Sequence, residues 1–182
     1  MKKVLVGFLS LILVGQVSFA QPVSDMAVIP IGITIQNIMR LTITKGGNIE
    51  FVFKSADDIA NGIGPSAAYV TTGTVVATQA WDLNMVTDAA QFDNEGGTAT
   101  LPLTTVGYAT NGTGPSTGTG VALTALSNTS AVIVNAGAVT NAGTFQIDWE
   151  CGTGNAPVTV IPNTTAGGRY TLNVILSLGP DL

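Results

Sequence analysis

Histidine is absent from this 182-residue chain. Its absence excludes Ser-His-Asp triads, histidine metal ligands and histidine acid–base catalysis. The sequence also has no phosphate-binding P-loop and no G-x-S-x-G nucleophile motif. A pair of carboxylates could still support glycoside hydrolysis, but the spacing of the aspartates and glutamates does not predict that any two converge. We therefore expect that the protein is not an enzyme.

Cysteine is nearly absent as well, since Cys151 is the single one. One cysteine cannot form a disulfide within the chain, so the fold must be held by packing and strand pairing. Phe145, Ile147, Trp149 and Cys151 alternate along one face of a predicted strand, which indicates that Cys151 is a small core residue. For an exported protein the alternative is a disulfide between chains or a reactive thiol.

Charge is scarce: charged residues make up 9% of the chain, with six bases against eleven acids. Two of the bases, Lys2 and Lys3, lie in a predicted leader, and the others are scattered. Binding to nucleic acid or to an anionic membrane requires clustered lysine and arginine. We therefore expect neither as a partner.

The start of the chain has the features of an export signal. Two lysines precede an apolar run over 4–17, which is too short for a mature membrane span. Ser18 and Ala20 place small residues at positions minus three and minus one of a cleavage site, so we expect cleavage after Ala20 and secretion to the cell surface. No later apolar run is long enough to span a membrane. The predicted division is a signal peptide at 1–20, an N-terminal extension at 21–36 and a β-sandwich domain at 37–182.

Valine, isoleucine and threonine, which favour strands, are abundant, and so are turn-forming glycine and asparagine. Short alternating segments with such turns between them predict an all-β fold: a single antiparallel β-sandwich, immunoglobulin-like or jelly-roll-like, with a β-strand N-terminal extension. A helical turn is expected within 54–66. The turn Lys45-Gly46-Gly47-Asn48 predicts a hairpin that joins 38–43 to 49–53. Further strands are expected at 67–77, 81–85, 101–108, 121–126, 131–135, 145–151, 158–161 and 169–178.

The longest alternating segment runs from Ala27 to Ile43. As one strand it would extend about 55 Å at about 3.3 Å per residue, which is far longer than an ordinary strand. Asn37 interrupts its apolar face, so we predict that the chain divides there and that 27–35 is a candidate donor strand for a neighbouring subunit. The alternative is two strands of one monomer, bent at Gln36-Asn37, with Pro30 on a sheet edge. The expected polymer contacts are the apolar positions Ala27, Ile29, Ile31, Ile33 and Ile35.

An acidic loop from Asp88 to Gly97 is the candidate metal site. Asp88, Asp93 and Glu95 supply carboxylate oxygens, the ligands that calcium prefers, and glycines allow a tight turn. The spacing does not match an EF-hand, so solvated turn carboxylates are the commoner explanation. No other cofactor is expected.

Both ends of the chain resemble secreted fimbrial subunits, namely the chaperone–usher pilins and the spore-coat-U-like proteins. The similarity consists of the apolar segment 27–35 close behind the leader, the sequence Trp149-Glu-Cys-Gly152, and Gly168-Arg-Tyr170 before an alternating final strand. The resemblance implies an incomplete immunoglobulin-like sandwich whose groove is filled by the N-terminal extension of another subunit. Strand addition of this kind uses backbone hydrogen bonds and side-chain pockets, and a head-to-tail contact grows a filament.

The predicted function is therefore a structural subunit of an extracellular bacterial filament or pilus. Its expected partners are other copies of itself, with an export chaperone as a further candidate. A related scheme, in which proteolysis near Arg40 releases the first strand, also fits. The alternative is a secreted stand-alone β-sandwich that binds carbohydrate or acts as a surface adhesin. Trp81 and Trp149 are expected in the core, which leaves Tyr69 and Tyr108 as candidate surface aromatics.

Overall fold

The computed structural model describes residues 26–112 and 118–181. The predicted signal peptide and its cleavage site lie outside the described residues. The chain divides into two units, Met1–Ile35 and Gln36–Leu182. In the first unit, the described residues 26–35 form no helix or strand.

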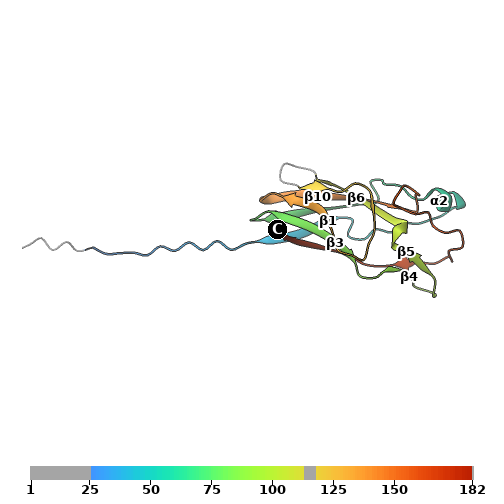
Figure 1. Ribbon diagram of the computed structural model, residues 1–182, viewed down its shortest axis with the longest axis horizontal. Helices are drawn as coiled ribbons and strands as arrows, with labels where there is room; N and C mark the ends of the chain where they lie inside the picture. The colour runs from blue at the N-terminus through green and yellow to red at the C-terminus, as the bar shows by residue number, and fades with distance from the viewer. Residues whose placement is uncertain (1–25, 113–117, 182) are drawn as a thin grey trace, which may run out of the picture. The chain divides into compact units, whose positions relative to one another are not determined.

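The second unit is an all-β, sandwich-like domain with antiparallel sheets, as predicted (Figure 1). Its elements in chain order are β1 (Met39–Lys45), α2 (Ala56–Asn61), β2 (Val70–Ala77), β3 (Trp81–Thr87), β4 (Gln91–Asn94), β5 (Thr100–Pro102), the 3-10 helix η1 (Leu103–Thr105), β6 (Val106–Gly112), β7 (Thr119–Gly120), β8 (Thr124–Ala125), β9 (Ala131–Gly137), β10 (Thr140–Cys151), β11 (Tyr170–Thr171) and β12 (Val174–Pro180). Among the described residues, no helix is long and apolar enough to cross a membrane.

Three sheets build the domain. The largest has the order β1-β2-β10-β6-β8, the second β12-β3-β9-β7, and a small third sheet β11-β4-β5. Every ladder between these strands is antiparallel. The first and last long strands, β1 and β12, are therefore each the outermost strand of a sheet.

The core lies between the two larger sheets. From the second sheet, Trp81 and Leu83 of β3 are fully buried, with Asp82 between them less so, as period-two alternation requires. The first sheet contributes Phe145 and Ile147. The Phe145 ring lies over Gly73 of β2, where a Cβ would come within 2.4 Å of the ring, so this position requires glycine.

The predicted hairpin between 38–43 and 49–53 is wrong. β1 pairs with β2 instead, with Met39 opposite Ala77. Gly46 has a φ of 66°, and a Cβ there would meet the Val70 carbonyl oxygen at 2.1 Å. The Thr71 hydroxyl donates to the Gly46 carbonyl at 2.7 Å, which holds this turn against β2. The chain therefore turns away from β1 instead of returning along it.

Several further segments differ from the predicted pattern. The 3-10 helix η1 divides the predicted strand 101–108, the predicted strand 121–126 is reduced to β8, and the predicted strand 169–178 is interrupted between β11 and β12. Residues 158–161 form no strand, because the Val158 amide donates to Asn155 within a turn. The acidic loop contains a short strand, β4, which pairs with β5 and β11.

The helical turn predicted within 54–66 is confirmed as α2. The Ser55 side chain accepts the Asp58 amide at 3.0 Å, and Asp58 accepts the Ser55 amide in return. This reciprocal arrangement is a capping box, which satisfies amides that a helix start leaves free.

Candidate functional site

The predicted donor segment carries its isoleucines in full contact with solvent. Ile29, Ile31, Ile33 and Ile35 are between 80% and 85% exposed. In a β-strand, alternate side chains lie on the same side, so these four would form one apolar row if the segment paired as a strand. Burying one isoleucine stabilises a structure by about 1.5–3 kcal/mol. An exposed row of this size is therefore typical of an interaction surface.

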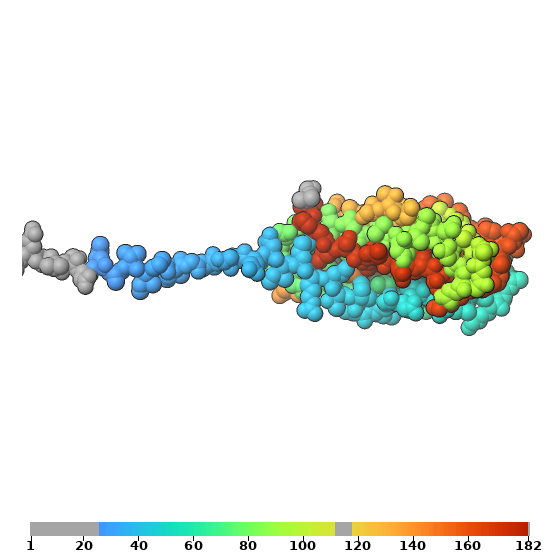
Figure 2. Space-filling model, turned by 90° about the horizontal axis from the view of Figure 1, so that it is seen from below, coloured from blue at the N-terminus to red at the C-terminus, as the bar shows by residue number. Residues whose placement is uncertain are grey.

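The domain has a complementary feature where β1 and β12 approach each other. Each is the outermost strand of its sheet, and no ladder joins the two in the described part of the chain. Outermost strands present a row of unpaired backbone N–H and C=O groups. Figure 2 shows this side, with β12 in red beside the light-blue and cyan residues of the first strand region.

The core is incompletely covered along these two strands. In β12 the inward side chains Leu176 and Leu178 are half-buried, although Leu178 pairs with Leu83 of β3, which is fully buried. In β1 the inward residues Met39 and Leu41 are likewise half-buried, although they pack against the core. The core is thus left partly exposed on the side where the next strand of a sandwich would lie.

Residues 49–53 extend this uncovered side. Ile49, Phe51 and Phe53 are half-buried and pack against the core, while Glu50 and Val52 between them are exposed. The segment alternates as a strand does, yet it belongs to no ladder of the described residues. We call β1, residues 49–53 and residues 172–178 the open edge. The sequence shows the alternation of 49–53, but the turn at Gly46-Gly47 predicts a hairpin partner that the structure does not provide.

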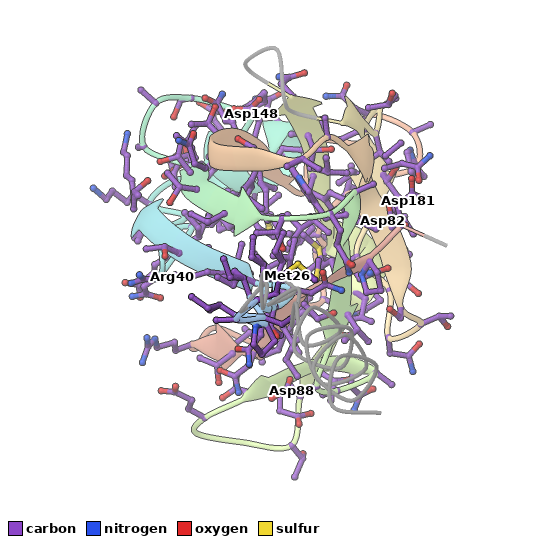
Figure 3. The ribbon with its side chains drawn as sticks, turned by 90° about the vertical axis from the view of Figure 1, so that its left-hand side faces the viewer. Met26, Arg40, Asp82, Asp88, Asp148 and Asp181 are labelled. Atoms are coloured by element: carbon purple, nitrogen blue, oxygen red, sulfur yellow. The ribbon has the colours of Figure 1, made fainter. Side chains whose placement is uncertain are left out.

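An ion-pair cluster lies beside the open edge at Glu50. Arg169, just before β11, pairs with Glu50 at 3.5 Å and with Glu95 at 3.2 Å, and all three side chains are about half exposed. Arg40 of β1 points away from the core (Figure 3). The inward side chains of the open edge are all apolar, which suits an apolar strand and not a charged ligand.

The structure does not bring the three candidate calcium ligands together. Asp88 accepts the backbone and side-chain N–H groups of Asn173, at 3.0 and 2.6 Å. Asp93 accepts from Gln91 at 3.4 Å, and Glu95 pairs with Arg169. Within residues 26–112 and 118–181, no group of three or more acidic, histidine or cysteine side chains could hold a metal ion.

Three of the acidic side chains lie apart from one another. Figure 3 shows Asp88 and Asp148 on different sides of the domain, both apart from Asp82. The carboxylate of Glu150, one of the acidic residues considered for a catalytic pair, is buried, accepts from Thr153 at 2.5 Å and lies near the Asn155 amide. These contacts hold the loop after β10, which is a structural role.

Cys151 is a buried core residue, as predicted. Burial raises the pKa of its thiol from 9.0 to about 12. Since the thiolate is the reactive form, this thiol is not a nucleophile near neutral pH.

Aromatic side chains offer no exposed platform for a sugar ring in the described residues. Trp81 and Trp149 are buried, as predicted. Tyr108 is also buried, so its prediction as a surface aromatic is wrong. Tyr69 is half-buried and stacks on Phe51, with ring centroids 4.6 Å apart.

Comparison with known proteins adds no relative to these observations. No protein-family model matches the chain, and no curated protein has significant similarity to it.

Proposed function

We propose that this protein is the structural, non-enzymatic subunit of an extracellular filament. In this proposal, residues 27–35 of one copy add a strand to the open edge of the next copy. One observation carries the proposal: the segment before the domain exposes a row of isoleucines, and the open edge leaves a row of apolar side chains half covered.

The two rows agree in spacing and are similar in length. As strands, residues 27–35 would extend about 30 Å and residues 172–178 of the open edge about 23 Å. Apolar side chains recur at every second position in both, and in residues 172–178 they face inward. Strand addition would pair the free backbone groups of β12 and bury the isoleucines over the uncovered core.

Pairing between copies is favoured over pairing within one copy. The Ile38 amide donates to the Thr78 hydroxyl at 2.8 Å, and the Thr78 amide donates to the Ile38 carbonyl at 3.0 Å. Only Gln36 and Asn37 would remain for the chain to reverse beside its own β1. Two-residue hairpin loops need positive φ and therefore favour glycine, which this dipeptide lacks.

Addition to another copy leads to open growth. The donor segment and the open edge are different surfaces of one chain, so the contact is head-to-tail and does not close on itself. Such a subunit needs no catalytic group and no cofactor. The predicted leader would place assembly outside the cell.

Deletion of residues 21–35 tests this function. The mature chain is expected to form filaments in negative-stain microscopy, whereas the truncated chain should remain a folded monomer by size-exclusion chromatography and circular dichroism. Filaments of the truncated chain would contradict the proposal. So would a full-length mature chain that stays monomeric at high concentration.

A further inference from the structure

A second apolar surface lies at the end of the domain that carries α2. It is a depression of about 580 Å³, lined mainly by Ile59 and Ala60 of α2 and by Val160, Ile161 and Pro162. Ile59 is 41% exposed and Val160 is 52% exposed. These side chains remain partly exposed to solvent, so the surface is available for a partner.

The edge segment 49–53 leads to this end of the domain. Phe53, its last inward residue, is separated by Lys54 alone from the helix cap Ser55, and α2 follows. Figure 1 shows α2 at the end of the domain opposite the start of β1. A strand that lies along the open edge therefore has one of its ends beside the depression.

The opposite end of the domain also exposes apolar side chains. Ile38 is 55% exposed and Val139 is 62% exposed. Ala77 of β2 pairs with Met39 on one side and with Thr140 on the other. The preceding residues, Ile38 and Val139, therefore lie at the same end of the sheet, on either side of β2. The turn that carries Val139 is held in place by the Trp81 indole N–H, which donates to the Ala138 carbonyl at 2.9 Å.

Strand direction decides which ends of two copies meet. All ladders of the domain are antiparallel, and antiparallel pairing is slightly the more stable. A donor strand antiparallel to β12 has its C-terminal residue, Ile35, beside Val174 and hence at the α2 end. From Ile35 to the anchored Ile38 the chain can extend at most about 11 Å. The α2 end of one copy is thereby brought against the Ile38 end of the next.

We infer that the depression at α2 is a subunit contact of the filament, and that it receives the Ile38 and Val139 end of a second copy of this chain. The inference rests on the proposed strand addition. Head-to-tail stacking covers both apolar ends at once, and it leaves each copy with the same free ends for further growth.

Cross-linking of a Val139→Cys, Val160→Cys double variant of the mature chain tests the contact. A short bismaleimide added to assembled filaments should give a ladder of covalent oligomers on a denaturing gel. Each single variant should give dimers at most. Cys151 does not compete, since its thiol is buried and its pKa is raised to about 12.

The matched control is Val139→Cys with Val132→Cys, because Val132 is also exposed, at 41%, but lies within β9, where it pairs with Asn84 in the middle of β3. This pair should give no ladder. Filaments that form normally but yield no ladder from the first pair, or an equal ladder from the control, overturn the inference and leave strand addition intact. If the unsubstituted mature chain forms no filaments, the proposed function itself is contradicted.

Discussion

At the scale of single residues, we expect the position of a substitution along the proposed donor segment 27–35 to matter more than the segment's overall composition. Odd positions from Ala27 to Ile35 carry the apolar row, while the even positions include Pro30, Gly32 and Thr34. In a strand the two sets face opposite sides. A polar group is therefore expected to disrupt assembly on one set and to be tolerated on the other.

Ile31→Asp and Thr34→Asp form a matched pair for this expectation. Ile31 is 85% exposed in the chain by itself, so neither change should affect the fold. In the assembled state Ile31→Asp would bury an unpaired carboxylate, which is strongly unfavourable, and sedimentation should find at least tenfold less polymer. Thr34→Asp should assemble normally. Equal assembly by both variants would contradict the assigned face.

At the scale of elements, the hydrogen bonds between Asp88 and Asn173 fix the start of β12 beside β3. Asp88 follows β3, and its carboxylate binds both N–H groups of Asn173, the residue before β12. The Asp88 amide also donates to the Asn173 carbonyl at 3.0 Å. The sequence placed Asp88 in a candidate calcium loop, whereas the structure shows it positioning one strand of the open edge.

The hydrogen bonds between Asp88 and Asn173 predict that the stability of the fold depends on pH. Two hydrogen bonds from Asn173 lower the pKa of the Asp88 carboxyl below 3.8. The side chain of Asn173 has the larger effect and its backbone N–H the smaller. The ionised carboxylate therefore stabilises the fold above pH 3.8, and this contribution is lost as the pH falls through the lowered value. Asp88→Ala should lower the thermal midpoint at pH 7, with a smaller difference from the wild type at pH 3.

Asp93→Ala is the control, because Asp93 accepts only a long hydrogen bond from Gln91. Its thermal midpoint should stay close to that of the wild type at both values of pH. An Asp88→Ala midpoint that differs from the wild type equally at pH 7 and pH 3 would contradict a role for the charged form.

At the scale of the whole molecule, the domain should be stabilised by the missing strand even when that strand is a separate peptide. A ligand that binds only the folded state, at one hundred times its Kd, adds about 2.7 kcal/mol. For a domain of this size that raises the thermal midpoint by roughly 5–11 °C. We expect such a rise when a peptide of residues 26–36 is added to the chain that lacks 21–35.

The same peptide with Ile31→Asp is the control and should give no rise. A thermal midpoint that does not respond to the unmodified peptide, or that responds equally to both, would show that the open edge does not accept this strand. Differential scanning fluorimetry at several peptide concentrations provides the measurement and an apparent Kd.

Local alternation in the sequence was sufficient to predict much of this protein. It predicted β3 from Trp81, Leu83 and Met85, and the burial of Cys151 beside Trp149. These features follow from side chains two residues apart, which face the same side of a strand whatever its neighbour is. The all-β antiparallel class follows from the same signal.

Strand partners were decided only by the tertiary structure. The sequence favoured a hairpin across Gly46-Gly47, yet β1 pairs with β2, and residues 49–53 have alternation without a ladder. The open edge likewise consists of segments from the start and the end of the domain, which are far apart in the chain. Alternation tells which side chains face a core, but pairing depends on long-range contacts and turn geometry that no short stretch encodes.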